Sequence, residues 1–390
     1  MKYPLITNNI SRNDLDKVIK FLKTDNPILT NNHYNLNFEK KWSSWLGVKY
    51  SVFVNSGSSA NLLTLAVLKE KFPKGGEIIV PSLTWSSDIN SIIFNGFKPV
   101  FIDISLKNLS LNIDLTLEAI TKKTVAVFIT HAQGFNGFNN KLLKTLRHKK
   151  IILIEDVCES HGATFKKKKL GTFGLMSNFS FYYAHHMSTI EGGMISTNNK
   201  KIYNSLLMLR GHGLLRECND STYINKIIKS RPDLNPNFIF MNKGYNVRNN
   251  EIGGLIGLNQ LKNLDYNINK RKKNFAYFVN KLDKNLYFTD FDLLGSSNYA
   301  FNLILKEKNT SLINKLKKNL IKSGIEFRMG SAGGGNQLRQ PYLSDIVGNT
   351  DYKKYPITEH VHFYGMYIGN YPSLKKIDID FILKIVNLIK

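Results

Sequence analysis

Five short apolar segments recur between positions 50 and 157, and polar or helical stretches separate each one from the next. Runs of this length, rich in Val, Ile and Phe, are typical of buried β-strands. They lie at 50–57, 77–82, 98–104, 124–130 and 150–157. Segments 58–72 and 140–150 have the pattern of helices. Because strands that alternate with helices favour parallel pairing, the sequence predicts an α/β domain with a mostly parallel central sheet.

The last third of the chain has a different pattern. Segment 251–284 predicts one long helix with a single break, and 214–242 before it is polar and has no clear pattern. The other elements that we expect are a helix at 200–213, a strand at 298–306, a helix at 311–324, a strand at 325–329 and a final helix at 378–390. We therefore predict a large α/β domain at 1–265 and a small C-terminal α+β domain at 266–390.

The formal net charge of +25, from 54 basic and 29 acidic residues, raises nucleic-acid binding as a first hypothesis. The basic residues are mostly lysines, spread in short runs such as 166–169 and 270–273, and no zinc-finger, RRM or helix-turn-helix pattern accompanies them. An anionic small substrate fits this charge at least as well. We therefore expect no nucleic-acid partner.

Cysteine and apolar content limit the class of protein further. Cys158 and Cys218 are too few for a four-cysteine zinc site or an all-cysteine iron–sulfur cluster. The chain has no apolar run of about eighteen residues, the length that predicts a membrane span, and its start lacks the order of a signal peptide. We expect a cytoplasmic protein without a membrane partner, metal centre or iron–sulfur cluster.

Polar residues follow several of the predicted strands, which is where open α/β sheets place their ligands. Gly57 and Ser58 stand between a strand and a helix, where backbone N–H groups can bind phosphate or simply cap the helix. Trp85 follows the next strand and either stacks on a flat cofactor or fills the core. Asp156 ends a very apolar strand, so it either pairs with a protonated ring nitrogen or caps a turn.

The segment "SFYYAHHMSTIEGG" at 180–193 contains a serine hydroxyl, two adjacent histidines and a Glu-Gly-Gly turn. Adjacent side chains point in different directions, so His185 and His186 make a poor metal site. A histidine titrates near neutrality, and one of the pair as a general base is the better interpretation.

Taken in order, these features resemble the DegT/DnrJ/EryC1/StrS sugar aminotransferases, which bind pyridoxal phosphate on the aspartate-aminotransferase (type I) fold. The resemblance covers nearly the whole chain and includes "GYNVRNNEIGGLIGLNQL" at 244–261 and "RGHG" at 210–213. It implies that Trp85 stacks on the cofactor ring, that Asp156 binds the ring nitrogen and that Glu159 lies near the phenolic oxygen. It also implies a phosphate site made by Gly57, Ser58 and Ser180, with Asn246 from the neighbouring subunit of a homodimer with shared active sites.

In these aminotransferases a lysine follows the serine of this segment by five residues, and here that position is His185. The exchange, together with "GTFG" at 171–174 and "YIGNYP" at 367–372, resembles the GDP-4-keto-6-deoxymannose 3-dehydratase branch of the family. That branch implies pyridoxal and pyridoxamine phosphate held without a covalent bond, glutamate as amino donor and His185 as the catalytic base. The product would be a 3-deoxy-4-keto sugar that feeds deoxysugar and O-antigen-type polysaccharide biosynthesis.

Segment 326–343 is glycine-rich where this branch has a short proline-containing turn, which puts the identity of the nucleotide sugar in question. His212, Arg248 and Arg328 are candidate contacts of the sugar or its diphosphate, and a structural ion pair or hydrogen bond is at least as good an interpretation of each. Two alternative functions stay open: an aminotransferase that works with histidine, and a non-catalytic relic that still binds the cofactor. A second kind of 3-dehydratase, acting on CDP-sugars, needs an iron–sulfur cluster that two distant cysteines do not supply.

Overall fold

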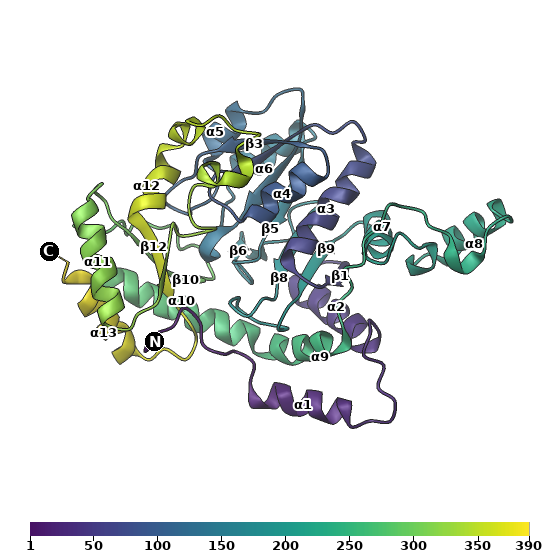
Figure 1. The fold of residues 1–390 in the computed structure, drawn as a ribbon, viewed down its shortest axis with the longest axis horizontal. Helices are drawn as coiled ribbons and strands as arrows, with labels where there is room; N and C mark the ends of the chain where they lie inside the picture. Colours follow the sequence, from purple (N-terminus) through teal and green to yellow (C-terminus); the bar gives the residue numbers. More distant parts are fainter. Residues whose placement is uncertain (390) are drawn as a thin grey trace.

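A seven-stranded sheet with the strand order β1-β9-β8-β5-β4-β2-β3 forms the centre of the computed structural model, which describes residues 1–389 (Figure 1). Its strands are β1 (Tyr50–Val54), β2 (Glu77–Pro81), β3 (Lys98–Ile102), β4 (Thr124–Thr130), β5 (Ile152–Asp156), β8 (Met176–Ser180) and β9 (Gly193–Thr197). Neighbouring strands are parallel, except that β9 is antiparallel to both β1 and β8. The predicted α/β fold with a mostly parallel sheet is confirmed.

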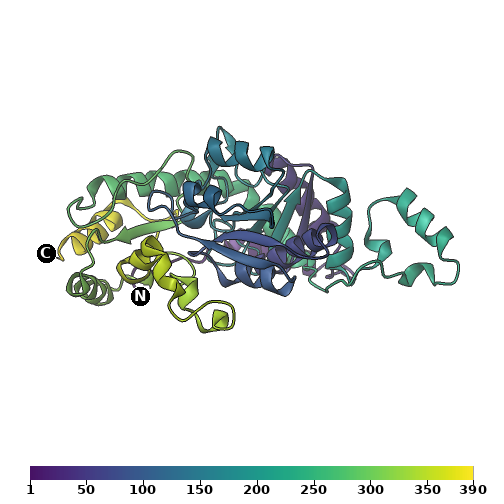
Figure 2. The same cartoon turned by 90° about the horizontal axis from the view of Figure 1, so that it is seen from above.

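Both faces of this sheet are buried, which explains why β2, β3 and β4 and most of β5 read as apolar runs, whereas β8 and β9 also carry buried Ser, Asn and Thr. On β2, Ile78 and Val80 pack into one hydrophobic cluster, whereas Ile79 between them packs into the cluster on the opposite face. Figure 2 shows helices on either side of the sheet. They are α2 (His33–Leu46), α3 (Gly57–Lys71), α4 (Ser86–Phe94), α5 (Ile113–Glu118), α6 (Asn140–His148) and α7 (Lys200–Arg210).

A second, three-stranded sheet has the order β10-β12-β11 and is antiparallel throughout. Its strands are β10 (Ala300–Ile304), β11 (Phe327–Met329) and β12 (Gly365–Gly369), and the neighbouring helices are α10 (Leu264–Lys281), α11 (Thr310–Lys322), α12 (Pro356–Tyr364) and α13 (Lys376–Asn387). The sequence predicted all of these elements except α12 and β12. Strand β12 begins and ends with glycine. The small sheet and its helices share one hydrophobic cluster. Tyr3 belongs to this cluster and pairs with Ile325, so the first residues pack against the last third of the chain. The division at residues 265 and 266 stays a prediction.

The long helix predicted at 251–284 is present and has its single break. It consists of α9 (Glu251–Gln260), a 3₁₀ turn at Leu261–Asn263, and α10. The stretch at 214–242 differs from the prediction, because it contains α8 (Ser221–Ser230), whose first turn is capped by the Asp220 side chain. No residue of α8 is buried, and Figures 1 and 2 show it standing away from the body of the molecule.

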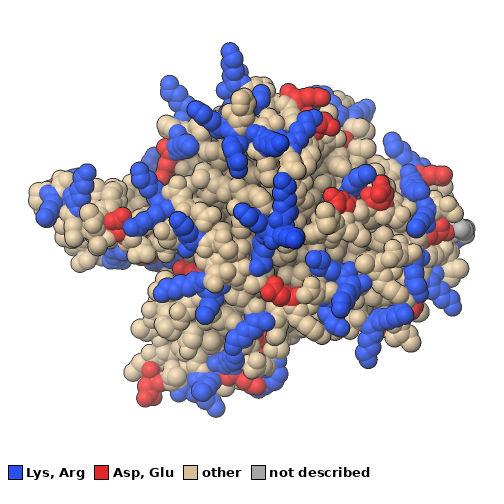
Figure 3. Space-filling model, turned by 180° about the vertical axis from the view of Figure 1, so that it is seen from behind, with Lys and Arg blue, Asp and Glu red and all other residues tan. Residues whose placement is uncertain are grey.

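The remaining elements are α1 (Arg12–Leu22) and the short hairpin of β6 (Thr164–Phe165) and β7 (Lys168–Lys169). Lys and Arg side chains are spread over the face in Figure 3 rather than gathered in one stripe. Within residues 1–389, none of the helices combines the length and the apolar character that crossing a membrane requires.

Candidate active site

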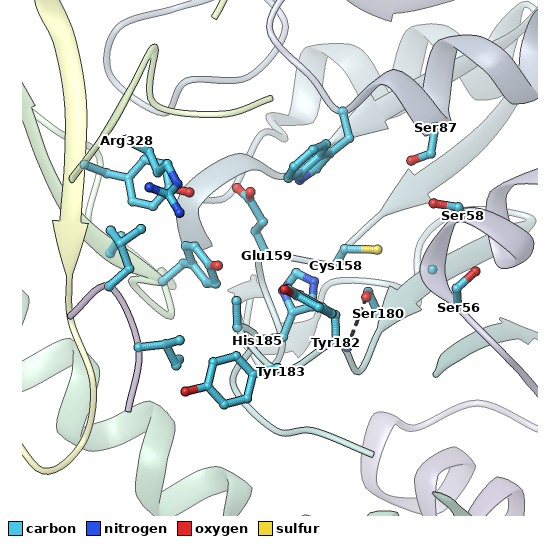
Figure 4. A pocket seen from close by; sticks show the side chains of 18 of the residues that line it. Ser56, Ser58, Ser87, Cys158, Glu159, Ser180, Tyr182, Tyr183, His185 and Arg328 are labelled. Carbon is cyan, nitrogen blue, oxygen red and sulfur yellow. Dashed lines mark hydrogen bonds between the residues drawn. The ribbon is translucent and has the colours of Figure 1, made fainter. Parts of the chain in front are cut away.

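A cavity of about 780 Å³ lies where the ends of β1, β5 and β8 face the edge of the small sheet (Figure 4). One end is built by the first turns of α3 and α4 together with Asp156 and Ser180. The other end is built by the N-terminal segment at 4–6, Glu326, Arg328 and Tyr367. Of the residues predicted from the sequence, the cavity brings together Gly57, Ser58, Trp85, Asp156, Glu159, Ser180, His185 and Arg328.

The first turn of α3 forms a cradle that only glycine permits. Ser56 caps the helix by accepting a hydrogen bond from the Ser59 N–H at 3.0 Å. A Cβ atom on Gly57 would lie 2.6 Å from Cβ of Ser180 and 3.3 Å from Sγ of Cys158. Because Gly57 lacks this atom, the helix N-terminus approaches the end of β8 closely and leaves N–H groups and the Ser58 and Ser180 hydroxyls around the cavity. This donor set fits a phosphate group.

Asp156 lies at the carboxyl end of β5 and is 3% exposed. Its Oδ1 accepts a hydrogen bond from the Cys158 N–H at 2.9 Å, and its Oδ2 accepts one from Asn61 Nδ2 at 3.2 Å. No Lys, Arg or His side chain among residues 1–389 hydrogen-bonds or ion-pairs with this carboxylate in the structure. A buried carboxylate that lines a cavity and has no cationic partner of its own fits a ligand that brings a positive charge, such as a protonated ring nitrogen.

Trp85 and Glu159 approach the same space from different elements. Trp85 stands just before α4 and is 51% exposed in the wall of the cavity rather than packed in the core. Glu159 is buried and accepts a hydrogen bond from the Gln133 N–H at 2.8 Å. Burial raises the pKa of Glu159 to about 7, although the hydrogen bond from Gln133 opposes the shift. Glu159 therefore titrates near neutrality and is able to exchange a proton with a ligand.

His185 follows β8 in the loop that the sequence singled out, and it lines the cavity. It is 7% exposed, and its Nδ1 has no hydrogen-bond partner among the described residues. Burial, together with the positive charge of Arg271, lowers the pKa of His185 to about 3, so the imidazole is neutral at physiological pH. A neutral ring with an unpartnered nitrogen is suited to accept a proton from a bound ligand.

His186 has different surroundings. It is buried outside the cavity lining, and its Nε2 lies 3.2 Å from the carbonyl oxygen of Ser297. Only one member of the histidine pair therefore faces the candidate site. Within the part of the chain that the structure describes, no three His, Cys, Asp or Glu side chains form a group that could hold a metal ion.

Sequence reasoning missed several residues of the lining. Arg271 on α10 is buried, donates to the carbonyl oxygen of Tyr299 at 2.7 Å, and has its pKa lowered to about 10 by burial. At the other end of the cavity Glu326 forms an ion pair with Arg328 at 3.2 Å and accepts a hydrogen bond from the Leu5 N–H at 3.0 Å. Glu326 stands directly before β11 and Arg328 lies within it, and their two-residue spacing was the one local signal that the two side chains point the same way.

Three predicted residues do not line the cavity of their own chain: His212, Asn246 and Arg248. His212 and Asn246 are exposed, and Gly211 pairs with Asn246 through a backbone bridge. Arg248 forms an ion pair with Glu217 at 3.3 Å, which is the structural alternative that the sequence left open.

The glycine-rich segment 330–336 is also absent from the lining. It packs behind the loop that carries Trp85, because a Cβ atom on Gly333 would lie 2.0 Å from the Thr84 carbonyl oxygen and the Gln337 N–H donates to Ser82 O at 3.1 Å. The segment thus supports the cavity wall rather than forming it. Its departure from the related pattern does not by itself argue for a different sugar.

Comparison with known proteins agrees with this site. The model of the DegT/DnrJ/EryC1/StrS aminotransferase family matches residues 8–387. A GDP-4-keto-6-deoxy-D-mannose 3-dehydratase of Escherichia coli O55:H7 is 34% identical over 392 residues, covering 99% of this chain and 100% of the relative.

Two solved structures are similar over nearly the whole chain. An E. coli GDP-4-keto-6-deoxy-D-mannose-3-dehydratase with bound hydrated PLP has a TM-score of 0.89 at 32% identity, covering 98% of this chain and 99% of that one. A GDP-4-keto-6-deoxymannose-3-dehydratase with a trapped PLP-glutamate geminal diamine has a TM-score of 0.86 at 32% identity, covering 98% of this chain and all of that one. The chain therefore belongs to the DegT/DnrJ/EryC1/StrS aminotransferase family.

Proposed function

We propose that this chain is a pyridoxal-phosphate-dependent 3-dehydratase. It removes the C3 hydroxyl of a nucleotide-linked 4-keto-6-deoxy sugar, with GDP-4-keto-6-deoxymannose as the first substrate to test. The observation that carries the proposal is His185, which stands where the family's aminotransferases have lysine and presents a buried, neutral imidazole to the cavity. The similarity to two 3-dehydratases at 34% identity supports the same reaction.

The residues of the cavity fit pyridoxal phosphate as a group. Gly57, Ser58 and Ser180 would hold its phosphate in the cradle, and Asp156 would pair with the ring nitrogen. Trp85 would cover one face of the ring, and Glu159 would lie near the phenolic oxygen. When bound, the cofactor supplies an electron sink for bond breaking at the sugar. The buried carboxylate of Asp156 supports this role because it favours a protonated ring nitrogen.

His185 would do the proton transfer. Imidazole does not form the stable imine that lysine forms, so the cofactor is held by its phosphate, ring and charge contacts alone. The neutral ring of His185 would take a proton from the bound ligand and pass it to the departing C3 hydroxyl, which then leaves as water. No lysine is present to bind the cofactor again and so complete the transfer of the amine to the sugar. The favoured outcome is therefore loss of the C3 hydroxyl with release of ammonia.

Glutamate as amino donor and the nucleotide sugar are both anionic, and Arg328 offers a positive charge at the open end of the cavity. Its partner Glu326 leaves the guanidinium only partly neutralised, since the Arg328 side chain stays 60% exposed. We assign Arg328 to the carboxylate of glutamate and to the diphosphate of the sugar in turn. The similar structure in which the cofactor is trapped with glutamate supports glutamate as the donor.

The test is mass spectrometry of the sugar after incubation with pyridoxal phosphate, glutamate and GDP-4-keto-6-deoxymannose. We expect a product lighter by one oxygen atom, with ammonia and 2-oxoglutarate released. A product that carries nitrogen would make the chain an aminotransferase that works with histidine. If several nucleotide sugars stay unchanged while the protein binds the cofactor, the chain is a non-catalytic relic.

We further propose that two chains share their active sites as a homodimer. Asn246, His212 and Arg248 lie outside the cavity of their own chain, yet the Asn55 N–H beside the phosphate cradle donates to Val247 O at 3.0 Å. These polar residues are thus on the surface near the cradle, where they could serve a partner. Mixing His185→Asn chains with Asn246→Ala chains should restore about a quarter of wild-type activity, because half of the dimers hold one intact site. No recovery would place each site within one chain.

A further inference from the structure

A second buried carboxyl group lies behind Asp156. Asp88 is in the first turn of α4 and is fully buried. Its Oδ1 accepts a hydrogen bond from Asn61 Nδ2 at 2.6 Å, and its Oδ2 accepts hydrogen bonds from the hydroxyls of Thr130, at 2.7 Å, and Thr84. Nothing in the proposed reaction uses this group, so its burial needs another explanation.

Asn61 connects the two carboxyl groups. The same Nδ2 atom lies 2.6 Å from Asp88 Oδ1, 3.2 Å from Asp156 Oδ2 and 3.3 Å from Ser87 Oγ. An amide nitrogen has two protons for these three acceptors. Asn61 can therefore donate to only two of them, and because its contact with Asp88 is the shortest, Asp156 and Ser87 compete for the other proton. A proton between the two carboxyl groups would give Asp156 a further donor.

Charge favours that proton. The ionisable neighbours that act on Asp88 or respond to it are Asp156, Cys158 and Tyr342, and none of them is a cation. Among the described residues no Lys, Arg or His hydrogen-bonds or ion-pairs with either carboxyl group in the structure. Two adjacent buried carboxylates without a cation do not both ionise. Burial and the neighbouring Asp156 raise the pKa of Asp88 well above its ordinary value.

Geometry decides which of the two holds the proton. The backbone N–H of Cys158 donates to Asp156, which stabilises the ionised form of that residue, and Asp156 faces the cavity. Asp88 is absent from the cavity lining. Besides Asn61, the side-chain donors to its carboxyl group among the described residues are the hydroxyls of Thr84 and Thr130, which lower its pKa but do not outweigh burial and the neighbouring Asp156. The dipole of α4 favours an ionised Asp88, but this effect is smaller than the cost of burying a second carboxylate.

We propose that Asp88 is a positioning residue for the cofactor: it stays protonated at neutral pH and donates that proton to Asp156, which it holds ionised and aimed at the ring nitrogen. The inference rests on the proposed function, because it takes Asp156 to be the partner of that nitrogen. It adds a residue that acts through Asp156 and never touches the cofactor.

The first test needs no cofactor. Infrared spectra of the apoprotein at pH 8.5 should show the C=O stretch of a protonated carboxyl group that shifts in D₂O. The difference spectrum between wild type and Asp88→Asn should contain the loss of one such band, while the bands of other buried acids cancel. A difference spectrum without that loss would overturn the proposal.

The second test measures the affinity for pyridoxal phosphate by fluorescence titration. Asp88→Asn keeps a donor toward Asp156, so its dissociation constant should stay within about threefold of wild type, whereas Asp88→Ala should weaken binding about tenfold because a hydrogen bond to a charged group is lost. Thr130→Val is the matched control, since it removes a buried hydroxyl from the same carboxyl group and leaves Asn61, which links Asp88 to Asp156, in place. It should bind the cofactor as wild type does.

Asp156→Asn separates the two proposals. If this variant binds the cofactor as tightly as wild type, Asp156 does not face the ring nitrogen and the proposed cofactor site itself fails. If Asp156→Asn weakens binding while Asp88→Ala and Thr130→Val behave alike, the site stands and the role of Asp88 is wrong. Should Asp88→Ala fail to fold, the infrared difference with Asp88→Asn still decides.

Discussion

The two ends of the cavity are built in different ways. At the cradle end, Gly57, Asp156 and Ser180 lie at strand ends of the large sheet or in the helix that follows. A Cβ atom on Gly57 would lie 2.6 Å from Cβ of Ser180, so no side chain fits there. At the open end, Arg328 on the short strand β11 forms an ion pair with Glu326, which directly precedes that strand, beside the N-terminal segment. The Arg328 side chain is 60% exposed.

This difference matches two tasks. A cofactor that stays bound through many turnovers needs preorganised donors with fixed positions, which strand ends and helix N-termini supply. Two substrates of different shape that enter in turn need a site with side chains that can move. We therefore expect changes at the cradle end to alter cofactor binding or chemistry, and changes at the open end to alter the KM of the substrates.

The largest expected effect comes from His185. Replacing it with Asn should lower kcat about 10³-fold, because a general base contributes 10²–10⁴ in rate, while the affinity for pyridoxal phosphate stays within about threefold. His186→Asn is the matched control and should keep kcat within about tenfold, since His186 lies outside the cavity lining. Steady-state kinetics and cofactor titration on both variants check this. An equal loss of kcat in the two variants would show that His185 is not the general base.

Glu159 gives a pH dependence of stability. Its pKa is about 7 in the folded chain, against 4.5 for an ordinary glutamate, so between these values the folded state binds a proton that the unfolded state lacks. Stability of the apoprotein therefore falls as pH rises from about 4.5 to about 7, by about 3 kcal/mol from this group. Urea unfolding at pH 5 and pH 8 should show that wild type loses about 3 kcal/mol more stability between these pH values than Glu159→Gln does. If both proteins lose the same amount of stability between pH 5 and pH 8, Glu159 is not desolvated in the folded state.

Gly57 tests the rigidity of the cradle. Gly57→Ala places a Cβ atom 2.6 Å from Cβ of Ser180, so the helix N-terminus has to move and the phosphate contacts loosen. We expect about 50-fold weaker cofactor binding, from overpacking that typically costs 1–3 kcal/mol. Gly348→Ala is the control, because its Cβ would meet nothing closer than 3.4 Å. Fluorescence titration on both variants measures the difference in cofactor affinity. Unchanged binding by Gly57→Ala would show that the first turn of α3 can shift without loss of the cofactor contacts.

Arg328 should give the smallest effect. Arg328→Ala removes an exposed cation, so we expect KM for glutamate and for the nucleotide sugar to rise about tenfold with little change in cofactor affinity. The free energy of unfolding should change by less than about 1 kcal/mol, since exposed ion pairs contribute little. Glu326→Gln, which frees the guanidinium, should not raise KM. Weaker cofactor binding by Arg328→Ala would show that the open end also contributes to the cofactor site.

Local patterns in the sequence were sufficient to predict much of this protein. Apolar runs of strand length predicted β1 to β5, because both faces of the sheet are buried. The pattern did not predict β8, whose sequence Met-Ser-Asn-Phe-Ser is partly polar. Asp156 was placed at a strand end by the same pattern. The resemblance to the aminotransferase motif, counted from Ser180, separated His185 from His186, and the structure puts only the first in the cavity lining.

Other parts of the site depend on contacts between segments far apart in the chain. Leu5 meets Glu326, Arg271 reaches the carbonyl oxygen of Tyr299 near the cavity, and Asn61 joins Asp88 to Asp156. Periodicity reports which side of its own element a residue takes, and it carries no information on which distant element packs against that side. Burial then sets the charge of these groups, so the neutral state of His185 and the raised pKa of Asp88 were decided only when the chain had folded.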